Sequence, residues 1–525
     1  MRYTRRVLVA AIAGTTALAA PVAAEAAAPT RTEVVRDGVT LLLDRTPVSV
    51  KPYTGKGASR ADFDGDNRDD VAVFSNVGVA VAYSSAAHRD VLRTEIPGSG
   101  GGGFGYSMAA GDFNGDRYDD LAIGDYNEAD LRTMGYVAGA VWIIPGGPGG
   151  LQPNRAQHVN QSTAGVPGVS VQGDWFGFSL AAGDITGDGR DELAIGIPRK
   201  RIGNKAEAGA VVVLKGGANG VTTSAARWIS QDTAGVPGSP GTNDKFGFAV
   251  AIGRVDKNRY QELVVGAPGE SPDRGYNGSG TITQFWGTSA GASLKKVTAL
   301  HGGKIATTVR KLGVWEVGAA LAIGDVTGDG YSEVVCGVSG AQAGAEIYGG
   351  MVVTVPGRTT GLSAKGAIAI SQSSPGVAGA AESDDRFGDS IAVGDVTLDG
   401  RADVLVGVPG ENNGAGAVVL LRGSAKGLTG ARSQTLTQSS AGVPDGAERG
   451  DRFGANVALL NLNGSGGVDA LVAAPAEQVA GDHPGYGSGT VTRFLGGYRG
   501  LGNATLTSGR FLDPNGVGYG GHIAR

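Results

Sequence analysis

The sequence is short of cysteine and of charge, and each shortage excludes a class of protein. Cys336 is the only cysteine in 525 residues, so no disulfide can form within the chain and a large core or bound metal must stabilise it. Charged residues make up 18% and hydrophobic residues 41%, which is typical of a folded chain and not of a disordered polyelectrolyte. The net charge is −5 and no basic run follows the N-terminus, so nucleic-acid binding is not expected.

The N-terminus has the pattern of a secretory signal peptide. Arg2, Arg5 and Arg6 precede an apolar stretch over residues 7–20 that is too short to span a membrane, and an Ala-Glu-Ala sequence at 24–26 offers a cleavage site. The general and the twin-arginine export routes both stay open. No later apolar run is long enough to cross a bilayer. We therefore expect a secreted, extracellular monomer without a membrane span.

Glycine, by contrast, is abundant at 93 residues, without the Gly-X-Y period of collagen, and it marks turns in a repeated unit. The unit reads Phe-Gly-x-Ser-Leu-Ala-x-Gly-Asp, followed by an acidic loop and an apolar strand. The acidic loops begin at seven positions, which are Asp62, Asp112, Asp184, Arg254, Asp325, Asp395 and Asn461. The last six of these loops begin 66 to 72 residues apart, whereas the first interval is 50 residues.

Each unit has four short apolar segments bounded by turn residues, which predicts four strands. In the third unit the expected strands cover residues 176–183, 193–196, 210–214 and 226–231. No helical period is sustained, so helices are not expected. A Gly-x-x-x-Gly turn follows the third strand in most units, and we expect its glycines to supply positive φ. The sequence thus predicts an all-β fold, a seven-bladed β-propeller of four-stranded antiparallel blades, with a solenoid as the structural alternative.

This interpretation divides the chain into four parts. Residues 1–26 form the signal peptide, 27–54 an N-terminal segment, 55–508 the propeller and 509–525 a C-terminal segment. A strand near residues 38–43 could close the ring on the first or last blade. The C-terminal sequence Tyr-Gly-Gly-His-Ile-Ala at 519–524 resembles another Phe-Gly half and could close it instead. The two alternatives stay open at the level of sequence.

The acidic loops place oxygen-bearing side chains at loop positions 1, 3, 5 and 9. Calcium binds six to eight oxygen atoms, and alternating positions allow one short loop to surround an ion, with position 7 adding its backbone carbonyl. A set of Asx turns in which Asp and Asn satisfy hairpin amides is the structural alternative. Five loops carry the pattern, and their candidate ligands are Asp62, Asp64, Asp66, Arg68, Asp70, Asp112, Asn114, Asp116, Tyr118, Asp120, Asp184, Thr186, Asp188, Arg190, Glu192, Asp325, Thr327, Asp329, Tyr331, Glu333, Asp395, Thr397, Asp399, Arg401 and Asp403.

The fourth and seventh loops depart from this pattern. The fourth has Arg254 at position 1, where a guanidinium could replace the cation. The seventh has Asn461 at position 1 and keeps one carboxylate, Asp469, so binding should be weak or absent. We therefore expect four to five calcium ions (Ca2+) per chain, and whether blades 4 and 7 bind metal stays open.

These residues resemble the FG-GAP repeat of the N-terminal propeller of integrin α chains. The Phe-Gly half stands at 104–105, 176–177, 246–247, 387–388 and 453–454, and the Gly-Ala-Pro half at 196–198, 266–268, 407–409 and 473–475. In the fifth unit Leu312-Gly313 stands in place of Phe-Gly. The resemblance covers roughly residues 55–508. It implies a seven-bladed propeller with calcium on one face and partner contact through loops on the opposite face.

Candidate catalytic residues have structural explanations within the repeat. Ser289 lies in a G-x-S-x-G sequence, but this is the same Gly-x-x-x-Gly turn as in five other units. The five histidines form no cluster at zinc-ligand spacing. The Arg-Gly-Asp tripeptide at 449–451 aligns with a loop that leads into a blade. The insert at 269–280 has no recognisable catalytic set.

We therefore expect no enzymatic activity and predict an extracellular binding or adhesion-type module, with an unknown extracellular protein or glycan as partner. A hydrolase with its site in propeller loops and a passive structural protein of the cell envelope are the alternatives. The sequence does not identify the partner.

Overall fold

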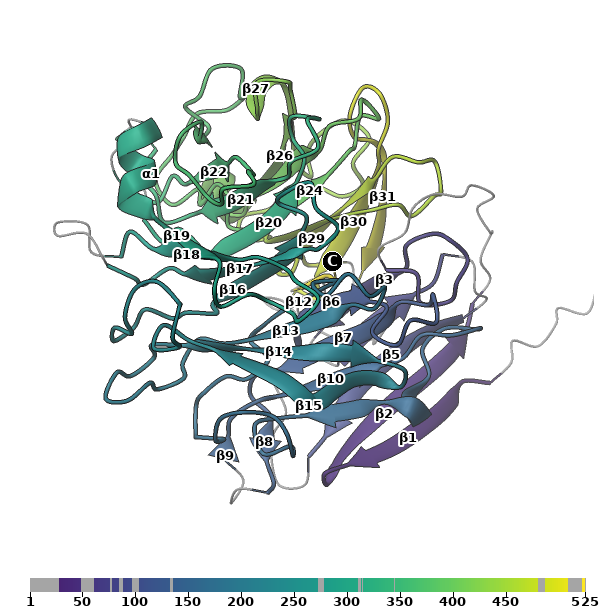
Figure 1. Ribbon diagram of the computed structural model, residues 1–525. Helices are drawn as coiled ribbons and strands as arrows, with labels where there is room; N and C mark the ends of the chain where they lie inside the picture. The colour runs from purple at the N-terminus through teal and green to yellow at the C-terminus, as the bar shows by residue number, and fades with distance from the viewer. Residues whose placement is uncertain are drawn as a thin grey trace, which may run out of the picture.

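The computed structural model describes residues 28–48, 61–75, 78–84, 88–96, 103–132, 136–271, 278–309, 313, 315–343, 345–479, 487–508 and 522–524. These residues form seven antiparallel sheets of four or five strands, arranged around a central axis as the blades of a propeller (Figure 1). The predicted all-β, seven-bladed fold is confirmed. The predicted signal peptide lies outside the described residues.

The blades follow one another along the chain. Blade 1 contains β1 (Thr30–Arg36), β2 (Val39–Pro47), β3 (Val71–Ser75), β4 (Gly78–Ala82) and β5 (His88–Glu95). Blade 2 contains β6 (Phe104–Gly111), β7 (Asp120–Asp125), β10 (Ala140–Ile144) and β11 (Gln157–Val159), and blade 3 contains β12 (Ser179–Gly183), β13 (Glu192–Ile197), β14 (Ala210–Gly217) and β15 (Gly220–Ile229). Blade 4 contains β16 (Ala249–Gly253), β17 (Glu262–Ala267), β18 (Thr281–Phe285) and β19 (Val297–His301).

Blades 5 to 7 have the same four-stranded order. Blade 5 contains β20 (Ala320–Gly324), β21 (Glu333–Val338), β22 (Met351–Val355) and β23 (Ile368–Ile370). Blade 6 contains β24 (Ile391–Gly394), β25 (Asp403–Val408), β26 (Ala417–Arg422) and β27 (Thr429–Leu436), and blade 7 contains β28 (Asn456–Leu460), β29 (Asp469–Ala474), β30 (Thr490–Leu495) and β31 (Gly502–Ser508). Short elements join them, namely β8 (Ala129–Asp130), β9 (Tyr136–Val137), η1 (Pro153–Arg155), α1 (Gly302–Val309) and α2 (Glu411–Gly414).

The core lies between neighbouring blades. The innermost strands β6, β12, β16, β20, β24 and β28 contact one another in sequence around the axis. The second strand of each of these blades, such as β13, is buried along its whole length because a blade covers each of its faces. This explains why these segments read as continuous apolar runs and not as alternating ones.

Both chain segments that were candidates for closing the ring belong to blade 1. On the outer side, β2 pairs with β5, and β1 pairs with β2. On the inner side, Ile523 pairs with Val73 of β3 in the register that Met108 and Ile123 adopt in blade 2. The Phe74 and Ala524 amides complete this pairing with hydrogen bonds of 2.8 and 3.0 Å. One apolar cluster then joins residues of blade 7 to blade 1, so the ring is closed.

The structure corrects the expected pattern in blade 5. Val317-Gly318 occupies the Phe-Gly position there, and not Leu312-Gly313, because Val317 bridges Gly280 as Phe246 bridges Gly209 in blade 4. An insert containing helix α1 precedes this position, although no helix was expected. In blade 3 the predicted first strand is also too long, since residues 176–178 form a turn before β12. The observed fourth strand, β15, begins earlier than predicted, at Gly220.

The Gly-x-x-x-Gly turns need their two glycines for different reasons. Gly220 has a φ of +106°, as expected for the second glycine. Gly216 does not have positive φ. A Cβ atom on Gly216 would lie 2.5 Å from the carbonyl oxygen of Asp191, so the first glycine allows the turn to approach the acidic loop of the same blade.

Candidate calcium loops

The acidic loops all lie at one end of the blades. In blades 2 to 7 each loop joins the innermost strand to the second strand, and in blade 1 it leads into β3. The linkers between blades and the loops after the second strands lie at the other end of the innermost strands. The repeat therefore separates the candidate ligands from the opposite loop face.

The position 1 carboxylate shapes each of the five loops. Asp112 Oδ1 accepts hydrogen bonds from the amides of Gly115 and Asp116 at 2.6 and 3.1 Å, and its Oδ2 accepts one from Arg117 at 2.9 Å. Asp62, Asp184, Asp325 and Asp395 accept the amides of their own positions 5 and 6 in the same way. The position 5 carboxylate accepts the amide of position 7 in all five loops.

The Asx-turn hydrogen bonds of the structural alternative are thus present, and they account for positions 1 and 5. They do not account for position 9. Its carboxylates are at most 4% exposed in the five loops, and these are Asp70, Asp120, Glu192, Glu333 and Asp403. Each of them accepts a backbone amide hydrogen bond. Burial of a carboxylate without a cation is still costly, so position 9 is where a cation would stabilise the loop most.

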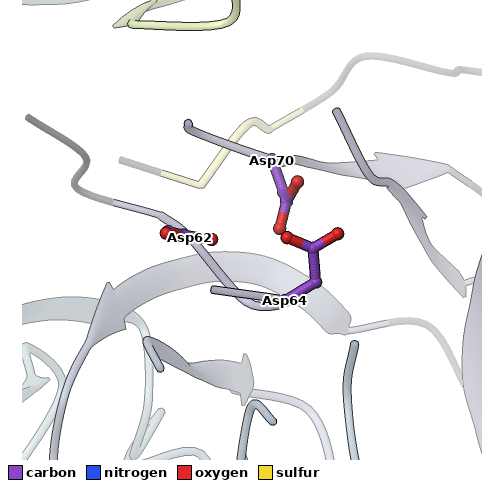
Figure 2. A group of neighbouring side chains, drawn as sticks. All are labelled: Asp62, Asp64 and Asp70. Atoms are coloured by element: carbon purple, nitrogen blue, oxygen red, sulfur yellow. The ribbon is translucent and has the colours of Figure 1, made fainter. Parts of the chain in front are cut away.

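Loop 1 brings three predicted ligands together. Asp62, Asp64 and Asp70 each present a carboxylate oxygen within 4.8 Å of the others, and Figure 2 shows the Asp64 and Asp70 carboxylates facing each other. The fourth carboxylate, Asp66, turns aside to accept a 2.6 Å hydrogen bond from the Ser84 hydroxyl. Within the described part of the chain, loop 1 is the only predicted loop whose carboxylates converge this closely.

The neutral position 3 residues contact position 9 in the other loops. Asn114 donates to Asp120 at 3.2 Å, Thr186 to Glu192 at 3.2 Å, and Thr397 to Asp403 at 3.0 Å. In loop 5, Thr327 donates instead to Asp325, its position 1 carboxylate, at 3.2 Å. Positions 3 and 9 are therefore neighbours in loops 2, 3 and 6 as they are in loop 1.

Burial and like charge raise the pKa of the position 9 carboxyls. Burial, together with the charges of the nearby Asp116 and Asp112, raises the pKa of Asp120 to about 8. Burial also raises the pKa of Glu192 and of Glu333 to about 7. The pKa of Asp70 is raised well above its usual range by burial and by the charge of Asp64. A hard cation would relieve these groups because it restores the charged form.

Cations of the protein itself lie close to three of the loops. The Arg68 guanidinium is 3.5 Å from Asp66 in loop 1. The Lys215 ammonium is 3.1 Å from Asp188 in loop 3, and the Arg422 guanidinium is 3.6 Å from Asp403 in loop 6. Each reduces the negative potential that would attract an ion. The donor sets, all oxygen and mostly carboxylate, still fit calcium, which would supply the positive charge that the position 9 groups need.

The two divergent loops differ from each other. In loop 4 the Arg254 side chain is exposed and, among the described residues, has no hydrogen bond or ion pair, so it does not replace a cation as suggested. Glu262 at position 9 is buried, and burial raises its pKa to about 7. In loop 7, Asn463 donates to Asp469 at 3.1 Å, which gives that carboxylate a neutral partner.

Sequence reasoning missed the role of position 8. Asp119 donates its amide to the carbonyl of Asp62 at 2.9 Å and accepts the Asp62 amide at 2.8 Å. Asp191 pairs with Asp112 in the same two ways, and Asp69 with Asn461. These pairs join loops of adjacent blades around the ring. The Asp-Asp sequence at positions 8 and 9 of loops 1 and 2 was the available signal.

Other singled-out residues have structural roles. Ser289 is exposed in its turn, where Thr288 donates to the Gly291 carbonyl at 2.7 Å. Asp451 of the Arg-Gly-Asp tripeptide is 4% exposed and accepts the Glu448 amide, so its carboxylate does not project from the surface. Cys336 is fully buried in β21, and burial raises its pKa to about 12. Residues 272–277 of the 269–280 insert lie outside the described residues.

Comparisons with known proteins match this architecture. The FG-GAP repeat family matches residues 104–144, 176–214, 317–347 and 387–421, and an FG-GAP-like repeat matches 62–123. Integrin alpha-PS2 of Drosophila melanogaster is 32% identical over 197 residues, which is 36% of this chain and 12% of that protein. Integrin alpha-5 of Xenopus laevis is 31% identical over 234 residues, covering 43% and 21%, and integrin alpha pat-2 of Caenorhabditis briggsae is 32% identical over 237 residues, covering 41% and 18%.

The chain thus spans 12% to 21% of the length of these relatives. The match that begins at residue 317 agrees with the corrected position of the fifth Phe-Gly half. In the described part of the chain, no helix is long and apolar enough to cross a membrane.

Proposed function

We propose that this chain, an FG-GAP repeat protein whose propeller resembles that of integrin alpha chains, is a secreted calcium-binding module that binds a protein or glycan partner outside the cell. Calcium holds the acidic-loop end of the blades, and the partner contacts the opposite end. The observation that carries the proposal is this division of the blades, with oxygen ligands at one end and a varied, partly exposed surface at the other.

The opposite end holds side chains on strained backbone. In blades 3 to 7 the residue before the Phe-Gly position, or before Val317-Gly318, has a φ between 57° and 65°, and these residues are Trp175, Lys245, Glu316, Arg386 and Arg452. A non-glycine residue in this region costs roughly 1–3 kcal/mol and is common at ligand-binding sites. The five side chains differ in size and charge, so they supply a surface that the repeat does not dictate. This supports a role in recognition.

Aromatic rings gather at the same end on blades 2 and 3, where Tyr106, Tyr126 and Trp175 are half-buried and Phe178 is buried. Tyr126 contacts Tyr106 and Trp175 with ring centroids 4.7 and 5.3 Å apart, and Phe178 stacks on Trp175 at 5.2 Å. The Arg199 guanidinium lies 4.5 Å from the centre of the Trp175 ring. Such amphipathic rings bind protein and sugar surfaces well because they offer large apolar area together with polar edges.

Retention assays on the native secretome and cell-wall fraction test the proposal. The variant Trp175→Asn/Tyr126→Ala removes two rings, and asparagine tolerates the positive φ at position 175. We expect at least tenfold weaker retention of the partner with an unchanged unfolding midpoint. Ser289→Ala, at the acidic-loop end, is the matched control and should retain the partner fully. Equal retention by both variants and the unchanged protein would refute the assigned face.

A further inference from the structure

Four of the linkers between blades carry a second repeated unit. A glutamine follows the outer strand, an aspartate stands two residues before the Phe-Gly position, and a third residue follows the second strand of the next blade. The glutamine and the third residue are separated by 39 positions in all four copies, which are Gln161 and Lys200, Gln231 and Glu270, Gln372 and Glu411, and Gln438 and Glu477. We call each group a junction and name it by its two blades.

Backbone hydrogen bonds place the third residue identically in each junction. Lys200 donates its amide to Ile197 at 3.1 Å, and Glu477 donates to Ala474 at 3.2 Å. Their carbonyls accept the amides of Gly209 and Gly489 at 2.9 and 3.0 Å. Lys200 in junction 2–3 and Glu477 in junction 6–7 therefore start from the same point of the fold.

Junction 2–3 contains a cation that belongs to the chain. The Lys200 side chain is 8% exposed, and its ammonium lies 2.6 Å from Asp174 Oδ2. It also donates to Gln161 Oε1 at 3.4 Å and to the Val169 carbonyl. A buried positive charge is thus surrounded by a carboxylate, an amide oxygen and a backbone oxygen.

Junction 6–7 keeps the oxygens and replaces the ammonium by a carboxylate. Asp445, Glu448 and Glu477 each bring a carboxylate oxygen within 4.8 Å of the others. Asp451, which corresponds to Asp174, is 4% exposed, and Glu477 is 1% exposed. Among the residues that the structure describes, none of these four carboxylates forms an ion pair with a lysine, arginine or histidine.

A buried amide oxygen at the same place also has no partner. Gln438 is 1% exposed and donates through Nε2 to Glu477, while its Oε1 accepts no hydrogen bond. Gln231 and Gln372 have the same arrangement in junctions 3–4 and 5–6, so it is the three carboxylates that distinguish junction 6–7. In junction 2–3 the orientation is the opposite, because Gln161 Oε1 faces the ammonium and Nε2 has no partner. The amide therefore turns according to the charge it meets. A buried polar atom without a partner is rare and requires an explanation.

We propose that junction 6–7 binds a calcium ion between Asp445, Glu448 and Glu477, beside the position that corresponds to the Lys200 ammonium. The ion is bound by the carboxylates of Asp445, Glu448 and Glu477 and by Oε1 of Gln438, whose amide turns as that of Gln161 does. Calcium is favoured because every donor is oxygen, and because the two exposed carboxylates leave room for the waters that complete six to eight ligands. The site lies on the opposite face from the acidic loops.

The remaining junctions have fewer of these carboxylates. Junction 5–6 has Glu382 in the place of Glu448 but glycine, Gly379, in the place of Asp445. Asp445 has a φ of +76°, a conformation that Gly379 adopts without strain, so junction 6–7 accepts strain to present this carboxylate.

The first test removes the two exposed ligands. Equilibrium dialysis with calcium alone should find one fewer ion per chain in Asp445→Asn/Glu448→Gln than in the unchanged protein. Both side chains are exposed, so folding should be unaffected, and circular dichroism checks this. Glu33→Gln/Glu95→Gln removes two exposed carboxylates from blade 1 and is the matched control, which should bind as many ions as the unchanged protein. Equal binding by all three proteins would overturn the proposal.

The second test supplies the cation covalently. Glu477→Lys should lose the same single ion, and its unfolding midpoint without metal should equal or exceed that of the unchanged protein, because the new ammonium meets Asp451 and Gln438 as Lys200 meets Asp174 and Gln161. Full calcium binding by a folded Glu477→Lys protein would refute the site. If Glu477→Lys does not fold, the number of calcium ions bound by Asp445→Asn/Glu448→Gln tests the site.

Discussion

Removing calcium should lower the thermal stability of the propeller by an amount that follows from its loops. An ion that binds the folded state at one hundred times its dissociation constant adds about 2.7 kcal/mol. Four to five such loops add roughly 11 to 14 kcal/mol in total. At about 2.1 cal/mol/K per residue, a domain of this length unfolds with an entropy of roughly 1 kcal/mol/K. Calcium should therefore raise the unfolding midpoint by roughly 10 °C.

The stabilising effect of calcium should depend on pH, and the direction of this dependence follows from the pKa values of the position 9 carboxyls. The pKa values of Asp120, Glu192 and Glu333 are about 8, 7 and 7 in the folded state, well above the unfolded values near 4. The folded protein holds these protons more tightly, so without metal the stabilising contribution of these three groups is greatest at low pH and is lost as the pH rises from about 4 to about 8. Calcium needs the ionised groups, so its stabilising effect grows over the same range.

Calorimetry at pH 5 and pH 8, on metal-free protein with and without added calcium, measures both effects. We expect a small difference between the two midpoints at pH 5 and the full difference at pH 8. Magnesium at the same concentration controls for ionic strength and should shift the midpoint less. Equal midpoints with and without calcium at pH 8, or a difference that does not change with pH, would refute the reasoning.

Three further outcomes are expected. Metal analysis of the Asp445→Asn/Glu448→Gln protein should find four to five calcium ions. A count of seven ions, or a count of one ion or none, would contradict the ranking of the acidic loops. Asp184→Ala should weaken calcium binding at one loop several-fold, measured by calcium titration, without loss of partner retention. Ser289→Ala should change the free energy of unfolding by less than about 0.5 kcal/mol, measured by calorimetry. Gly287→Ala should lower the midpoint clearly, because its Cβ would lie 2.2 Å from a carbonyl oxygen, and an unchanged midpoint would contradict that contact.

The repeat made the blade architecture predictable from sequence. The acidic loops recur at a nearly constant interval, so seven blades and the end at which the loops lie follow from the pattern. The register of Ile523 on Val73 also follows once the sequence at 519–524 is aligned with a Phe-Gly half. Blade 5 was misassigned because Leu312-Gly313 resembles Phe-Gly locally. The true half, Val317-Gly318, is identified by its contact with Gly280, which sequence does not display.

The candidate loops were predictable as ligand sets but not as geometries. Alternating oxygens identified the positions, and loop 1 brings three of its carboxylates together as expected. Asp119 and Asp191 were overlooked because their partners belong to the preceding blade, at a distance in sequence that no local motif reports. Gln438 and Glu477 were overlooked for the same reason, since 39 positions separate two side chains that touch.

The pairing that completes blade 1 has a consequence for the order of folding during synthesis. Ile523 lies 450 positions after its partner Val73, so the inner edge of β3 stays unpaired until the rest of the ring has been made. At about 5–20 residues per second this takes roughly 20 to 90 seconds. During that time β3 presents an open apolar edge, the kind of surface on which nascent chains pair wrongly with one another. Blade 1 is therefore the first blade to leave the ribosome and the last to be finished.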